Sequence, residues 1–182
     1  VIIEPVQGEA GVHEANEKFL KSLRDLCNQN GTLLIMDEVQ SGIGRMGYLY
    51  GYMKYEIEPD ILTSAKGLGG GIPIGATLTK NDIASSLSTG THGSTFGGNP
   101  MACAVSNKII EIVSDPKFLI EVQKKEELMM NLLLEINSET ETFSGLRSSG
   151  LWICCDIKNA DAFDLLDKCY ENGLILVTAG NK

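Results

Sequence analysis

The stretch TLLIMDEVQ, residues 32–40, decides the fold. Its first five residues form a continuous run without charge, which is typical of a strand buried on both faces of a sheet. Apolar residues at helical spacing precede it over Glu14–Asn28, and further short runs follow at Ile61–Thr63 and Ile72–Thr79. Strands that alternate with helices in this way predict an α/β fold.

Two helix starts follow further along the chain. Asn99 is a good N-cap and Pro100 suits the first helical position, so we expect a helix that runs to about Val113. Asp115 and Pro116 repeat the same signal and open a long amphipathic helix.

The remainder of the chain has a different composition. Its pattern predicts a strand over Leu151–Ile157, a helix over Ala160–Asn172 and a strand over Leu174–Thr178. We therefore expect a domain boundary near the second helix start, with residues 1–114 in one domain and residues 115–182 in part of another.

Composition excludes some classes of partner. The net charge of −9 argues against nucleic acid, whose phosphates require a basic surface. The five cysteines include no C-x-x-C pair and the chain has only two histidines, so no metal site is expected. No apolar run approaches the length of a membrane span. This composition favours reduced thiols in a cytoplasmic protein; a targeting segment ahead of Val1 would instead indicate an organellar matrix.

Polar residues gather at the ends of the predicted strands, where open α/β sheets bind ligands. These segments are Asp37–Gln40, Ser64–Lys66 and the glycine-bordered Ser94–Asn99. An isolated aspartate at such a place is more often a cap or a solvated strand end, and an isolated lysine is usually a surface residue. The combination within one α/β unit is what indicates a site.

This combination suits the chemistry of pyridoxal 5′-phosphate. That cofactor requires a lysine amine for covalent attachment, a carboxylate at its ring nitrogen and an anion cradle for its phosphate. Lys66 and Asp37 are candidates for the first two groups, and the hydroxyls of Ser94 and Thr95 beside a glycine pair are candidates for the third.

Four stretches together resemble class III, ornithine- and acetylornithine-type aminotransferases. They stand in the family's order and at close to its spacing: EPVQGE (Glu4–Glu9), LLIMDEVQSGIGRMG (Leu33–Gly47), PDILTSAKGLGGGIPIGA (Pro59–Ala76) and HGSTFGGNPMACA (His92–Ala104). The resemblance implies a pyridoxal-phosphate transferase of fold type I, like aspartate aminotransferase. Residues 1–114 would then be part of the large cofactor-binding domain, and residues 115–182 part of the C-terminal α+β small domain.

The resemblance also implies a role for each matching residue. Lys66 matches the catalytic lysine, Asp37 the partner of the ring nitrogen, Val39 the residue packed on the ring and Gln40 the residue near the ring hydroxyl. Glu38 is counted with these cofactor-binding residues as the one that orients the loop. Val39 could equally be plain core, and Gln40 could cap a turn.

Further roles come from the same resemblance. Thr95 matches a phosphate ligand that reaches the neighbouring subunit of a homodimer, and Ser94 its companion at the substrate. Glu9 matches a gate glutamate, which pairs with a substrate-binding arginine until a dicarboxylate displaces it; a solvated Glu9 is the alternative. His92 is expected to have a turn or surface role, and Arg45 a structural role in its loop.

The implied reaction moves an amino group from N-acetylornithine, or an ornithine-like donor, to 2-oxoglutarate in arginine biosynthesis. Ornithine, succinylornithine and 4-aminobutyrate are alternative donors. A pyridoxal-phosphate isomerase or decarboxylase, or a non-catalytic phosphate-binding module, remains as an alternative from another class. The family's N-terminal phosphate loop is expected before Val1 and its substrate-carboxylate arginine beyond Lys182.

Overall fold

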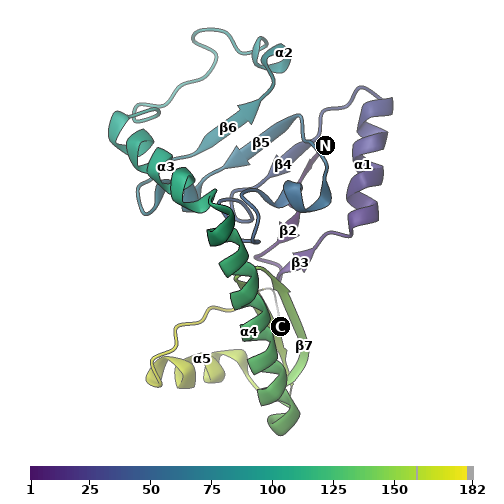
Figure 1. The fold of residues 1–182 in the computed structure, drawn as a ribbon, viewed down its shortest axis with the longest axis vertical. Coiled ribbons are helices and arrows are strands. Elements are labelled where there is room, and N and C mark those ends of the chain that lie inside the picture. Colours follow the sequence, from purple (N-terminus) through teal and green to yellow (C-terminus); the bar gives the residue numbers. More distant parts are fainter. Residues whose placement is uncertain (159, 180–182) are drawn as a thin grey trace.

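The computed structural model describes residues 1–158 and 160–179 of the chain. Figure 1 shows a sheet with its flanking helices at one end of the molecule and a two-stranded hairpin with a short helix at the other. The long helix α4, Pro116–Thr140, extends from one part to the other. Within the described residues, no helix is both long enough and apolar enough to cross a membrane.

The main sheet contains the strands that the sequence predicted between residues 32 and 79, although the last of them begins only at Ala76. Its order is β1 (Ile2–Ile3), β4 (Ile35–Asp37), β5 (Ile61–Ser64) and β6 (Ala76–Thr79). The first three strands are parallel and β6 is antiparallel to β5. The carboxyl ends of β1, β4 and β5 therefore meet at one edge of the sheet.

Helix α1, Glu17–Gln29, confirms the helical spacing but starts later than that spacing suggested. The side chain of Asn16 accepts hydrogen bonds from the two backbone N–H groups of Lys18 and Phe19, so the helix begins after it. The preceding residues instead form a small hairpin, in which β2 (Val6–Gln7) pairs with β3 (His13–Glu14). This hairpin leaves residues 8–12 as a loop beside the sheet edge.

The hydrophobic core lies between the sheet, α1 and the loop that follows β4. It is formed by buried apolar side chains from these three parts and from the β2–β3 hairpin: Val6, Val12, Leu20, Cys27, Leu34, Met36, Met46, Tyr50, Tyr55, Ile57 and Leu62. This core fixes the strand ends and the loops that leave them.

Both predicted helix starts are confirmed. Helix α3 spans Pro100–Val113, and the Asn99 side chain accepts a hydrogen bond from the N–H of Ala102. Helix α4 follows after Asp115, whose side chain accepts from the N–H of Lys117. Helix α3 packs against the turn that begins at Lys66.

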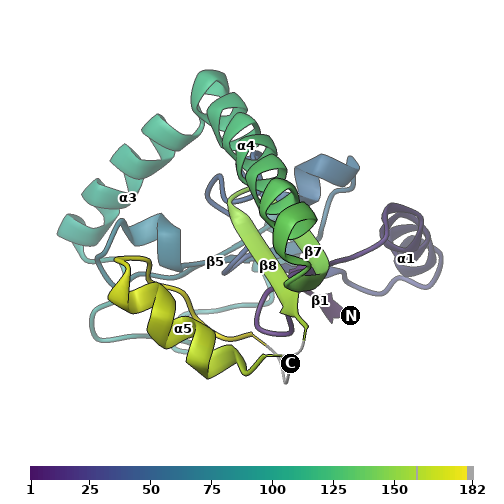
Figure 2. The same cartoon turned by 90° about the horizontal axis from the view of Figure 1, so that it is seen from below.

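The last part of the chain differs in two respects from the prediction. Strand β8 (Trp152–Ile157) and helix α5 (Ala162–Glu171) were expected, but β8 pairs with an unforeseen antiparallel strand, β7 (Phe143–Ser149). The predicted strand over Leu174–Thr178 is wrong, because these residues form no strand. Their apolar pattern suits a strand, but a strand also needs a paired edge, and Val177 is instead 85% exposed. Figure 2 shows the β7–β8 hairpin beside α4, with α5 to one side.

Candidate active site

Asp37 is held at the end of β4 by two hydrogen bonds to one carboxylate oxygen. The hydroxyl of Thr63, its partner in the register with β5, donates to Asp37 Oδ1 over 2.9 Å. The N–H of Val39 donates to the same oxygen over 3.1 Å. These bonds fix the carboxylate at the sheet edge where ligands of α/β folds bind.

Lys66 follows β5 and starts the 3₁₀ turn Lys66–Gly69. Its φ of +47° lies in the left-handed region, which is uncommon for a residue with a side chain. That conformation costs about 1–2 kcal/mol per residue, so the surrounding packing must hold it. A Cβ at Gly67 would lie 3.3 Å from Ile43, and α3 packs against the turn from behind.

Four charged groups lie close enough at this edge to influence one another. Glu4 follows β1 directly, and partial burial raises the pKa of its carboxyl group. The negative charges of Asp37 and Glu9 also raise the pKa of Glu4, while the positive charge of Lys66 lowers it. The predicted residues Asp37 and Lys66 are thus both close enough to Glu4 to act on its carboxyl group.

Glu4 was not among the predicted site residues, although a signal for it exists. Ile3 pairs with Met36 in the parallel register, so the residues that follow them, Glu4 and Asp37, leave neighbouring strands at the same level. The pairing of β1 with β4 was not part of the sequence prediction, and without it the two carboxylates could not be placed together.

Glu38 has a different position from its neighbours in the sequence. Its side chain is fully buried beneath the loop, where Ser41 Oγ donates to it over 2.6 Å and the N–H groups of Gly51 and Tyr52 over 2.8 and 2.7 Å. Burial raises the pKa of Glu38, and the three hydrogen bonds oppose that rise. Glu38 therefore stabilises the loop after β4 by joining Ser41 to Gly51 and Tyr52, and it does not line the cleft.

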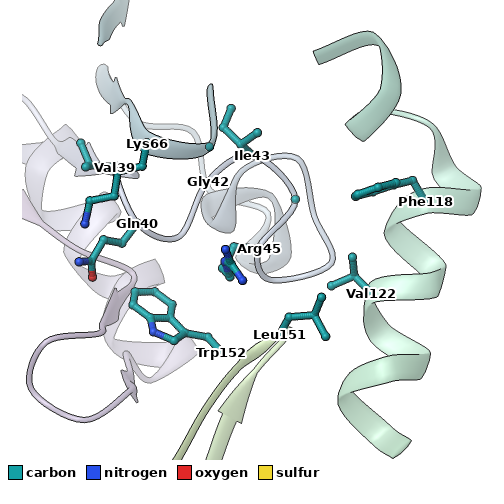
Figure 3. A pocket seen from close by; sticks show the side chains of 12 residues that line it. Val39, Gln40, Gly42, Ile43, Arg45, Lys66, Phe118, Val122, Leu151 and Trp152 are labelled. Carbon is teal, nitrogen blue, oxygen red and sulfur yellow. The ribbon is translucent and has the colours of Figure 1, made fainter. Parts of the chain in front are cut away.

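Val39, Gln40 and Lys66 face a cleft of about 480 Å³. Figure 3 shows the three side chains at one end of it, with Arg45 further along. The amide nitrogen of Gln40 donates to Glu9 Oε1 over 2.7 Å, so the predicted residue Glu9 is joined to the cleft. The other wall comes from α4, from the turn between β7 and β8 and from the first residue of β8: Phe118, Val122, Leu151 and Trp152.

Trp152 is a cleft residue that the sequence analysis missed. A Cβ placed on Gly8 would lie 1.6 Å from Trp152 Cζ2, so the indole ring rests directly on the backbone at Gly8. Trp152 is the only tryptophan of the chain, which could have drawn attention to it. Its contact with a residue more than a hundred positions earlier could not be read from local patterns.

Ser94 and Thr95 do not join the cleft within this chain. Both are exposed on the long loop between α2 (Asn81–Ala84) and α3, where the N–H of Gly97 donates to the carbonyl of Ser94 over 3.3 Å. His92 is exposed on the same loop. Arg45 faces the cleft with its side chain, and its carbonyl accepts from the N–H of Leu151 over 3.0 Å, as a structural loop residue would.

The groups at this edge of the sheet suit pyridoxal phosphate. The cleft contains the Lys66 amine and the apolar side chain of Val39, and Asp37, which does not itself line the cleft, provides a carboxylate at the end of the neighbouring strand. Gln40 Oε1 is buried and has no hydrogen-bond partner among the described residues, so a polar atom of a ligand can still be accommodated there. Within the same residues, no group of three or more His, Cys, Asp or Glu side chains could hold a metal ion.

Comparison with known proteins defines the class. The model of the class-III aminotransferase family matches residues 1–182, and the chain belongs to this family, which uses pyridoxal 5′-phosphate. The sequence-based recognition of the family is thereby confirmed.

Individual relatives narrow the resemblance. The chain is 47% identical, over 99% of its length, to the acetylornithine/succinyldiaminopimelate aminotransferase of Photorhabdus laumondii, and 49% identical to the succinylornithine transaminase of the same organism. It spans about half the length of these relatives, covering 45% and 46% of them.

Solved structures confirm the expected α/β fold. The chain superposes on ornithine aminotransferase from Plasmodium yoelii with a TM-score of 0.92 at 33% identity, covering 100% of this chain and 49% of that one. Acetylornithine aminotransferase from Elizabethkingia anophelis gives a TM-score of 0.91 at 38% identity, with 99% and 46% covered.

Proposed function

We propose that the chain forms part of a pyridoxal-phosphate aminotransferase that moves an amino group from N-acetylornithine, or its N-succinyl analogue, to 2-oxoglutarate. The observation that carries this proposal is the position of Asp37 and Lys66 at the carboxyl ends of the neighbouring parallel strands β4 and β5, with Lys66 in the cleft. The names of the similar bacterial enzymes support the choice of donor.

In this proposal each residue has a distinct task. When bound, the cofactor would supply an electron sink that stabilises negative charge at the substrate carbon. Asp37, fixed by Thr63, would keep the ring nitrogen protonated, and Val39 would pack on the ring face. Lys66 Nζ would bind the cofactor covalently and, once released, would carry a proton from the substrate carbon to the cofactor carbon that receives the amino group.

Glu9 and the loop with Ser94 and Thr95 would act at the margins of the site. The bond between Gln40 and Glu9 places the proposed gate carboxylate beside a residue of the cleft. The exposed position of Ser94 and Thr95, away from the cleft of their own chain, is what a contribution to a neighbouring subunit of a homodimer requires.

We also propose that residues 1–114 and 115–182 belong to separate domains, because the helix starting at Pro116 leads away from the main sheet.

A cofactor titration tests the assignment of Lys66. Added pyridoxal phosphate should produce a visible absorbance band, and borohydride reduction followed by peptide mapping should place the pyridoxyl group on Lys66. Lys66→Ala should abolish both signals. Lys80→Ala is the control, because Lys80 is an exposed lysine directly after β6 that forms an ion pair with Glu58. A label on another lysine would refute the assignment.

A second assay separates the reaction classes and the donors. Amino transfer requires an oxo acid as the second substrate, whereas an isomerase or a decarboxylase turns over without one. We expect turnover to depend on 2-oxoglutarate and to be faster with N-acetylornithine or N-succinylornithine than with ornithine or 4-aminobutyrate. Turnover without an oxo acid would contradict the proposal.

A further inference from the structure

The loop that carries Glu9 is held at both ends by the β7–β8 hairpin. At its first residue, Gly8, the Trp152 ring lies so close to the backbone that no side chain could be accommodated. At Gly11, the carbonyl accepts a hydrogen bond of 2.8 Å from Arg147 Nε. Glu9 lies between these two contacts, which come from the two strands of the hairpin: Arg147 from β7 and Trp152 from β8.

Arg147 is itself held in place by further contacts. Its two terminal nitrogens form a bidentate ion pair with Asp156 on the neighbouring strand, and one of them also contacts Cys154 Sγ at 3.5 Å. A planar guanidinium can satisfy a carboxylate with one edge and a carbonyl with its remaining N–H, which an ammonium cannot do with the same geometry. The bond to Gly11 is therefore directed by the hairpin.

The same hairpin also contacts the loop that carries Gln40. The N–H of Leu151 donates to the carbonyl of Arg45, and a Cβ at Gly150 would lie 2.1 Å from that carbonyl oxygen. Gly150 has a φ of +65°, so the hairpin turn can follow the loop this closely only with a glycine there. The β7–β8 hairpin thus contacts both the loop that carries Glu9 and the loop that carries Gln40, and these two side chains are joined by a hydrogen bond.

We propose that the β7–β8 hairpin sets the position of Glu9 relative to Gln40, with Arg147 and Trp152 as positioning residues. Glu9 is exposed and its loop contains two glycines, so without external contacts this segment would lose much conformational entropy on adopting one geometry. An effect of this positioning on the choice between substrates rests on the function proposed above, in which Glu9 is the gate. The positioning of Glu9 by the hairpin does not depend on that function.

Backbone hydrogen exchange tests the positioning without any activity. The N–H groups of Gly11 and Val12 both donate to the carbonyl of Gly8, over 2.9 and 3.2 Å. In Arg147→Lys we expect these two amides to exchange about five- to tenfold faster, because the loop loses one directed hydrogen bond. The emission of Trp152, the sole tryptophan, should shift to longer wavelength as its contact with Gly8 loosens.

Arg24→Lys is the matched control. Arg24 also joins a carboxylate, Asp60 at 2.8 Å, and a backbone carbonyl, that of Glu58 at 3.2 Å, but it lies on helix α1 and bonds to residues that precede β5. This variant should leave the exchange of Gly11 and Val12 and the emission of Trp152 unchanged. Unchanged exchange in Arg147→Lys, or an equal increase in both variants, would overturn the proposal.

A double-mutant cycle tests whether Arg147 acts through Glu9. The readout is the ratio of kcat/KM for N-acetylornithine to that for 2-oxoglutarate. Arg147→Lys should shift this ratio about threefold or more when Glu9 is present and should leave it unchanged in the Glu9→Gln background. Equal shifts in both backgrounds would show that Arg147 does not act through Glu9. If the wild-type protein transfers no amino group, the proposed function fails, and the exchange experiment still decides the positioning.

Discussion

The loop after β4 and the loop before α3 both looked like parts of one site, yet the chain holds them in opposite ways. In the first, the buried carboxylate of Glu38 accepts hydrogen bonds from Gly51 and Tyr52, which lie 13 and 14 residues away. In the second, residues 88–98, the bonds include Thr91 to Ser88 and Gly97 to Ser94, each joining residues three apart. Phe96 at its centre is 82% exposed.

This difference in hydrogen bonding indicates which contacts determine the conformation of each loop. Residues 38–52 are organised by groups of their own chain, so their geometry is set before any ligand binds. The hydrogen bonds described for residues 88–98 join near neighbours, and the ring of Phe96 is exposed, which suits a segment completed by another surface. Substitutions in the first loop should therefore lower the free energy of unfolding strongly, and substitutions in the second loop should lower it only weakly.

The largest effect is expected for Glu38→Ala. Removal of the carboxylate leaves the hydroxyl of Ser41 and two buried N–H groups without acceptors, at a cost of about 1–3 kcal/mol for each unsatisfied group. The free energy of unfolding, measured by urea denaturation, should fall by about 3 kcal/mol or more. Glu38→Gln, which retains one acceptor oxygen, should lose less. A loss below about 1 kcal/mol for the alanine variant would show that the loop is held by other contacts.

Asp37→Asn is expected to weaken cofactor binding without unfolding the protein. A contact to a charged group contributes about 1.5–3 kcal/mol, so the Kd for pyridoxal phosphate should rise about tenfold to a hundredfold. Absorbance titration provides the measurement. Thr63→Val, which removes only the hydroxyl that holds Asp37, should raise the Kd by a smaller factor. An unchanged Kd in Asp37→Asn would remove that residue from the site.

The raised pKa of Glu38 predicts a pH dependence of stability. Above the ordinary value of 4.5 the unfolded chain releases this proton while the folded chain still holds it. The contribution of Glu38 to stability therefore falls as pH rises from 4.5 to the raised folded pKa, by up to about 1.4 kcal/mol per pH unit, and is constant above it. The difference in unfolding free energy between wild type and Glu38→Gln, followed against pH, isolates this group. If the stability of wild type relative to Glu38→Gln increased as pH rises, the raised pKa of Glu38 would be contradicted.

The smallest effect on stability is expected in the second loop. Thr95→Ala should change the free energy of unfolding by no more than about 0.5 kcal/mol, because the side chain is exposed. If Thr95 serves the site of a neighbouring subunit, the same variant should still weaken binding of pyridoxal phosphate. A large loss of stability would contradict the contrast between the two loops, and unaltered cofactor binding would contradict the shared site.

Much of this comparison could be anticipated from the sequence. Asp37 and Lys66 follow apolar strands directly, and the caps at Asn99 and Asp115 are local signals, so neighbouring residues were sufficient to predict them. Strand β7, the contact between Trp152 and Gly8 and the nearness of Glu4 to Asp37 depend on pairing between distant segments. The apolar run at Leu174–Thr178 shows the converse error, because local propensity cannot provide a partner strand.

The left-handed backbone at Lys66 lowers the stability of the fold, although the proposed reaction needs a lysine amine at this position. Glycine would adopt the same φ without steric cost, so Lys66→Gly would relieve strain that the wild-type chain must carry. The amine that the reaction would need is thus tolerated at this turn only because the neighbouring packing outweighs the penalty. Stability alone would favour glycine at this position, so a lysine here is explained by what its amine does and not by ease of folding.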